Sequence, residues 1–136
     1  DYYASRGLGD VYKRQEPSIA AMAAIRADET DIQNILTACE NAEKLLLANK
    51  NHTEKDIAFH AAIALSSKNI VVPKLVPIIN SSIPLISDSK EYTLRDETIE
   101  THREIADAIA AHDAVRAHDA MYLHLIYNRK HIKSIN

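Results

Sequence analysis

An aspartate and three histidines are the residues of this chain whose types and spacing best suit chemistry. Asp56 and His60 stand four residues apart in a stretch with a helical pattern, so their side chains lie on one helix face, about one turn apart. His102 and His124 lie in later helical segments, at positions expected to face inward. Imidazole nitrogen suits zinc, nickel, iron and copper, and a carboxylate widens the choice toward manganese. We therefore predict that these four side chains meet around a transition-metal ion.

Each of the four residues also has a simpler role that must be weighed. Asp-x-x-x-His is common by chance, and residues 53–56 match a capping box, in which Asp56 would only support the start of a helix. The alternative for His102 and His124 is a core histidine bonded to a carbonyl or an acid. The other histidines lie in turns, at helix edges or among polar neighbours, where solvated surface positions are expected: His52, His112, His118 and His131.

Several other kinds of site are excluded by the sequence. There is no His-Glu-x-x-His motif of the common zinc proteases, and no pair of Glu-x-x-His motifs of a di-iron bundle. Glycines occur only at positions 7 and 9, which excludes a glycine-rich phosphate loop elsewhere in the chain. Cys39 stands in no local signature of a nucleophile. These exclusions leave the metal site and the simpler roles of its four residues both open.

The composition favours one all-helical domain to position these side chains. The chain has 136 residues, of which 46% are hydrophobic and 26% charged, with two glycines and no tryptophan. A chain of this length supports one core, and a sheet protein would need more glycine in its turns. We predict an all-α fold.

Charge and cysteine content limit the partners and the location. The net charge of −3 provides no basic field for phosphate backbones, so the chain alone is not expected to bind nucleic acid. Its single cysteine, Cys39, cannot form an internal disulfide and is expected to be buried. There is neither an apolar run of membrane-spanning length nor a secretory signal pattern. We expect a soluble, cytoplasmic protein with no membrane partner.

Hydrophobic periodicity and capping signals divide the chain into helices. Glu16 and Pro17 are expected to open the first helix, and the segment from Ile70 to Ser87, with prolines at 73, 77 and 84, is expected to form only kinked or broken helix. Asp113 is a candidate N-cap for the last helix. The expected helices run over about 16–27, 32–48, 53–67, 93–111 and from 114 onward, with a break and a new cap at 28–30.

Residues 1–15 differ from the rest of the chain. They hold both glycines and show no sustained apolar period. Residues 10–15 resemble translated sequencing-adapter sequence fused to incomplete gene fragments. We therefore expect residues 1–15 to be a non-native or disordered leader, residues 16–136 to form the domain, and the natural protein to extend further upstream.

The order of these signals resembles the FCD domain, the C-terminal effector-binding domain of GntR-family transcription regulators of the FadR subfamily. The resemblance covers about Glu16 to Ile132 and is specific as an ordered combination. The positions that carry it are Glu16-Pro17, Ala20, Ala23, Ala24, Arg26, Asp56, Phe59, His60, Asn69, His102, Ile105, Ala108, Ile109, Asp113, Ala117, Met121 and His124.

The resemblance implies an antiparallel bundle of about six to seven helices with an internal metal held by one aspartate and three histidines. These positions are Asp56, His60, His102 and His124. It implies a divalent transition metal, which we expect to be zinc, with nickel and manganese as alternatives. It also implies a homodimer and a small carboxylate effector, such as a sugar acid, a hydroxy acid or a dicarboxylate.

Two further residues acquire roles from the resemblance. Arg26 matches an arginine that often faces the effector pocket, where its guanidinium can bind a carboxylate through two hydrogen bonds; the alternative is a surface arginine at a helix end. Asn69 matches a family asparagine, for which helix capping is the alternative.

The chain departs from the family pattern in two ways. His112-Asp113 stands where Gly-Asp is usual, so the preceding helix is expected to end without a left-handed cap. No winged helix-turn-helix precedes the domain, so DNA would be read only through an N-terminal domain missing from this chain. We predict a sensing domain and not an enzyme; the alternatives are a small helical metalloenzyme and a metal-free helical interaction module.

Overall fold

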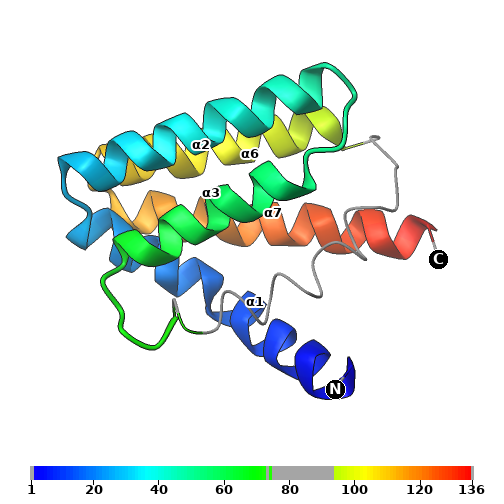
Figure 1. The fold of residues 1–136 in the computed structure, drawn as a ribbon, viewed down its shortest axis with the longest axis horizontal. Helices are drawn as coiled ribbons and strands as arrows, with labels where there is room; N and C mark the ends of the chain where they lie inside the picture. The colour runs from blue at the N-terminus through cyan, green and yellow to red at the C-terminus, as the bar shows by residue number, and fades with distance from the viewer. Residues whose placement is uncertain (1, 73, 75–93, 136) are drawn as a thin grey trace.

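The computed structural model describes residues 2–72, 74 and 94–135, in which the chain forms five helices and no strand (Figure 1). The helices are α1 (Tyr2–Arg26), α2 (Glu29–Leu47), α3 (Thr53–Ser66), α6 (Arg95–Ala110) and α7 (Ala114–Ile135). The all-α prediction is confirmed. The kinked pieces expected between residues 70 and 87 lie mostly outside the described residues. The five described helices are fewer than the six to seven expected, and they are compatible with a helical bundle.

Helix α1 begins well before the predicted start. It runs through Pro17 from Tyr2, so the prediction that Glu16 and Pro17 open the first helix is wrong. Tyr12 and Ile19 are both buried, one on each side of the proline, and their packing holds a helix that the proline would otherwise interrupt. That residues 1–15 are a non-native leader stays a prediction.

The helices pack as two antiparallel pairs with α1 across them. α2 and α3 are joined by a short turn and pack on each other, as do α6 and α7, and α2 also packs on α6 (Figure 1). α1 contacts α3, α6 and α7. α1 thus joins three helices that come from distant parts of the sequence. None of the described helices is both long and apolar enough to cross a membrane.

Small and branched side chains build the core between these helices. α1 contributes alanines and α7 contributes Ala117 and Met121, which let these two helices approach closely. Phe59 of α3 is fully buried at the centre. Other core residues include Ile19, Ala20, Ala23, Ala24, Ile35, Cys39, Ile63, Ile105 and Ile109.

Two of the expected helix starts carry side-chain caps and a third does not. Asp28 and Asp31 form a capping box before α2, and Asp113 accepts the N–H of Arg116 at the start of α7, at 3.1 Å. The capping box expected over residues 53–56 is absent, because α3 is entered through His52 and has no side-chain cap there. Asp56 is therefore not part of a capping box.

Three helices end in residues with left-handed backbone, and none of these is glycine. Asn49, Lys68 and His112 have φ of 54°, 60° and 57°. After α6, His112 N–H bonds Ile109 O and Asp113 N–H bonds Ala108 O, at 3.0 and 2.9 Å, which is a Schellman motif. The expectation that this helix ends without a left-handed cap is thus wrong, because a histidine holds the conformation usually left to glycine.

Each of these left-handed residues also bonds to a different helix end. Asn49 Oδ1 accepts from Arg95 at the start of α6, at 3.2 Å, and Lys68 Nζ lies 2.6 Å from Asp31 Oδ2 at the start of α2. His112 Nδ1 donates to the carbonyl of Ala24 near the end of α1, at 2.8 Å. His112 is exposed, as expected, and is also tied to α1 by this bond.

Candidate metal centre

The four predicted ligands converge at one point in the bundle. Asp56 and His60 come from α3, His102 from α6 and His124 from α7, and one candidate ligand atom from each lies within 4.8 Å of the others. Such a set could hold a metal ion. One helix supplies two ligand atoms because residues four apart share a face, and the packing of α6 and α7 brings the other two.

The cluster lies inside the protein, with the aspartate at its more open side. The side chains of His102 and His124 are 2% exposed, that of His60 is 11% exposed and that of Asp56 is 18% exposed. Asp56 Oδ1 lies 3.4 Å from His60 Nε2 and 3.3 Å from His102 Nε2. The carboxylate is thus shared between two imidazoles.

His60 is fixed by a second carboxylate on its other ring nitrogen. Glu16 Oε2 lies 3.1 Å from His60 Nδ1, and Glu16 is 4% exposed. Burial alone lowers the pKa of an imidazole, but Glu16 and Asp56 outweigh it and raise the pKa of His60 well above its usual range. Without a metal, the proton on His60 is therefore held strongly between two acids.

His124 is held by a hydroxyl whose own proton is already used. Thr101 Oγ1 donates to the carbonyl of Glu97 at 2.9 Å or of Thr98 at 3.2 Å, and it lies 3.0 Å from His124 Nδ1. Since the hydroxyl has one proton, it accepts from Nδ1–H of His124. The lone pair of neutral His124 is therefore on Nε2, where Asn128 Nδ2 also approaches to 3.4 Å.

His102 provides the strongest support for a metal at this cluster. Within the described part of the chain, neither Nδ1 nor Nε2 of His102 makes a hydrogen bond of good geometry, although both atoms are buried and Asp56 Oδ1 lies 3.3 Å from Nε2. The ring packs against Phe59, with centroids 4.6 Å apart. A buried polar atom without a partner costs about 1–3 kcal/mol, and a metal bound to Nε2 would remove this cost for that nitrogen. The residues present fit a metal in this respect.

The charge states of Asp56 and His124 also suit a cation. Burial alone raises the pKa of a carboxyl, but His60 and His102 outweigh it and hold the pKa of Asp56 well below its usual range. Burial, reinforced by the neighbouring His102 and His60, lowers the pKa of His124 well below its usual range. Asp56 is thus ionised and His124 neutral at neutral pH, which are the forms that bind metals.

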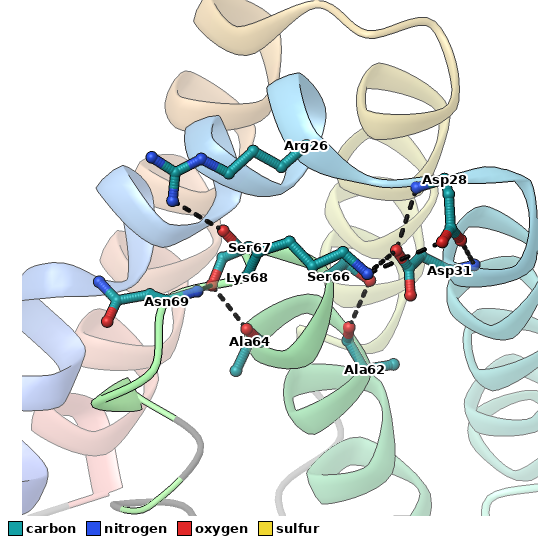
Figure 2. A network of polar contacts seen from close by, with 9 residues as sticks. All are labelled: Arg26, Asp28, Asp31, Ala62, Ala64, Ser66, Ser67, Lys68 and Asn69. Atoms are coloured by element: carbon teal, nitrogen blue, oxygen red, sulfur yellow. Dashed lines mark hydrogen bonds and ion pairs between the residues drawn. The ribbon is translucent and has the colours of Figure 1, made fainter.

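The two residues expected to bind an effector lie in a separate polar network at the end of α3 (Figure 2). Arg26 is exposed and its Nη1 donates to the carbonyl of Ser67 at 3.2 Å. Asn69 Oδ1 accepts the N–H of Val71, two residues further on, at 3.0 Å, as in an Asx turn. Among the described contacts, neither residue touches the four-residue cluster. Their ligand-binding role stays a prediction.

Two residues of the site were not found from the sequence. Glu16 lies on the apolar stripe of α1 with Tyr12, Ile19 and Ala23, at spacings of four, three and seven residues. An acid on such a stripe needs a buried partner, whereas the predicted helix start gives Glu16 only a favourable charge at that start. Thr101 gave no comparable signal, since a threonine beside a histidine is common.

A groove lies beside the cluster but has the wrong charge for an acid ligand. It has a volume of about 570 Å³, lies between α2, α6 and α7, and includes Thr101 but none of the four clustered residues. Arg103 is the basic residue in its lining. The acidic ones are Glu43, Asp96, Glu100, Glu104 and Asp107.

Comparisons with known proteins agree on one family. Residues 10–126 match the FCD domain. The chain is 31% identical over 117 residues to "Uncharacterized HTH-type transcriptional regulator YcbG" of Bacillus subtilis (strain 168), which is 86% of this chain and 49% of that protein. The solved structure of Streptococcus agalactiae GntR shares 31% identity with a TM-score of 0.78, over 93% of this chain and 58% of that one. The chain thus spans about half the length of the curated relative.

Proposed function

Since the chain belongs to the FCD domain family, we propose that it is the effector-sensing domain of a GntR-type transcription regulator. The observation that carries the metal-dependent part of this proposal is the convergence of Asp56, His60, His102 and His124, whose ligand atoms lie within 4.8 Å of one another. The Bacillus subtilis relative is named as a transcriptional regulator rather than as an enzyme, and the solved structure is named GntR. The family membership favours sensing over the metalloenzyme and the metal-free module considered above.

The proposed metal is a divalent transition ion, with zinc first and nickel or manganese as alternatives. His102 and His124 would bind it through Nε2, and Asp56 through a carboxylate oxygen. When bound, the ion supplies a positive charge in a largely buried site, where it attracts an anionic ligand. The chain itself supplies the orientation of the imidazoles through Thr101 and Glu16.

The proposed effector is a small carboxylate that reaches the cluster at Asp56, its most exposed member. The acidic lining of the neighbouring groove repels such a ligand, which leaves the cluster as the better site. Arg26 and Asn69 would take part only if the effector reaches the end of α3, since Arg26 now binds the carbonyl of Ser67.

The role of the whole regulator is a further part of the proposal. DNA would be read by a part of the regulator outside this chain, and the effector would change how that part is presented. A homodimer and a cytoplasmic location are expected for such a regulator and stay predictions.

Metal content and effector binding test the proposal directly. The 136-residue chain, purified without chelator, is expected to hold one metal per chain by elemental analysis. Calorimetric titration with sugar acids, hydroxy acids and dicarboxylates should detect binding that EDTA removes. Asp56→Ala should lose both the metal and the carboxylate, while Glu40→Gln, an exposed acid on α2, should retain both. Two results together would contradict the proposal: no metal in the purified chain, and equal carboxylate binding by the unchanged chain and the Asp56→Ala variant.

A further inference from the structure

Glu16 is a buried acid on a helix that supplies none of the four candidate ligands. Its side chain is 5% exposed, and its Oε2 lies 3.1 Å from Nδ1 of His60. α1 also packs against α3, α6 and α7, the three helices that carry the ligands. Burial of a carboxylate is costly unless it is bonded and compensated, so this contact needs an explanation beyond the packing of α1.

The contact determines which nitrogen of His60 is available. An ionised carboxylate only accepts hydrogen bonds, so Nδ1 carries the proton and donates to Glu16. The lone pair of the neutral ring then lies on Nε2, which is the nitrogen 3.4 Å from Asp56 Oδ1. Glu16 therefore turns the free nitrogen of His60 toward the other members of the cluster.

The charge balance points the same way. A divalent ion bound to three neutral imidazoles and one carboxylate keeps one positive charge in a site whose histidines are almost wholly buried. Glu16 would supply a second negative charge, bonded to the ring nitrogen of His60 that faces away from the ion. The ion, Asp56 and Glu16 together are neutral, which reduces the cost of holding a cation in the interior.

We infer that Glu16 is a positioning residue of the metal site: it orients His60 through Nδ1 and neutralises the second charge of the ion. The inference rests on the metal site proposed above. It also identifies α1 as the helix that is bonded to the cluster without contributing a ligand. A carboxylate that accepts the second ring N–H of a metal-bound histidine commonly increases metal affinity by about 10–100-fold.

Zinc affinity in matched variants separates this role from a purely structural contact. Glu16→Ala removes both the bond and the charge, and should weaken zinc binding about 10–100-fold in competition with a chromophoric chelator. Glu16→Gln keeps an acceptor for Nδ1–H without the charge, and should fall between Glu16→Ala and the unchanged chain. Glu40→Gln removes one exposed acid from α2 and should leave zinc affinity unchanged.

The ring nitrogens of His60 give a second readout that needs no variant. In the zinc-loaded chain, ¹⁵N NMR should show His60 with its proton on Nδ1 and zinc on Nε2. A proton on Nε2, or zinc affinity in Glu16→Ala equal to that of the unchanged chain, would overturn the inference while Asp56→Ala still tests the metal site. If the unchanged chain binds no zinc, nickel or manganese, the proposed function itself fails, and the inference with it.

Discussion

Thr101 Oγ1 lies 3.0 Å from Nδ1 of His124 and directs the other ring nitrogen of that histidine into the cluster. The hydroxyl can only accept in this contact because its proton goes to a carbonyl one turn back in α6. Thr101 supplies no ligand atom itself, but it thus selects the tautomer of His124, which is a candidate ligand. Its position immediately before His102 lets a single turn of α6 serve two of the four candidate ligands.

Removal of this hydroxyl is expected to weaken metal binding without unfolding the protein. Thr101→Val keeps the shape of the side chain but leaves Nδ1–H of His124 unpaired, so we expect about tenfold weaker zinc binding. Thr101→Ser retains the hydroxyl and should bind zinc nearly as well as the unchanged chain. Equal zinc affinities in the valine and serine variants would show that Thr101 does not orient His124.

Metal affinity should fall as the pH is lowered. Metal binding must displace the proton that His60 holds between Glu16 and Asp56, and the pKa of His60 is raised well above its usual range. Each proton displaced changes the apparent affinity by up to about tenfold per pH unit below that raised pKa. Zinc titrations at pH 6, 7 and 8 should show this slope, and an affinity independent of pH over that interval would contradict it.

The metal-free chain should be most stable near the pKa of a histidine in the unfolded chain, about 6.5. Above that value, the raised pKa of His60 means that the folded state binds more protons, so stability falls as the pH rises toward that folded pKa. Below it, the lowered pKa of His124 means that the unfolded state binds more protons, so stability falls as the pH drops. Urea unfolding in EDTA at pH 5, 6.5 and 8 measures both trends.

Variants assign each side of that pH profile to its residue. His60→Asn should flatten the fall above pH 6.5, and His124→Asn should reduce the fall below it. Continuous gain of stability from pH 6.5 to 8 in the unchanged metal-free chain would count against the strongly held proton on His60.

The histidine after α6 should be replaceable by glycine but not by alanine. His112→Ala keeps the left-handed strain and loses the bond to the carbonyl of Ala24, which should cost about 1 kcal/mol of unfolding free energy. His112→Gly loses the same bond but relieves about 1 kcal/mol of strain, so its stability should be close to that of the unchanged chain. Chemical denaturation of both variants measures the difference, and an alanine variant at least as stable as the glycine variant would contradict the account.

Arg26 can be tested for its two possible roles in one variant. Arg26→Ala removes the bond to the carbonyl of Ser67 at the end of α3 and should cost about 1 kcal/mol or less. Zinc affinity should be unchanged, because Arg26 makes no described contact with the cluster. Loss of carboxylate binding in this variant, with zinc still bound, would establish the effector role that the resemblance implies.

The helical periodicity predicts much of the site because its geometry follows from spacing. Asp56 and His60 share a face of α3 wherever near residue 53 the helix begins. His102 and His124 are expected to point inward because their neighbours on the same faces of α6 and α7 are apolar. Residue types alone therefore indicate that these four side chains are buried on helices. Whether the four side chains meet at one point depends on how the helices pack. Residue spacing within each helix carries no information about that packing.

The errors have local physical causes. Pro17 favours a helix start, yet packing on both sides of it extends α1 to Tyr2, and this hid the buried position of Glu16. The capping pattern at residues 53–56 was not used because His52 already precedes the first turn of α3. At Pro17, tertiary contacts outweighed a local preference of about 3 kcal/mol.

The three non-glycine residues with left-handed backbone at the helix ends have a consequence for how the protein opens locally. Each joins the end of its own helix to the end of another: Asn49 joins α2 to α6, Lys68 joins α3 to α2, and His112 joins α6 to α1. Glycine would allow the same turns but would leave each helix end to fray independently. With these side chains in place, local opening at one end breaks a bond at another, so the backbone amides of paired ends should exchange with solvent together.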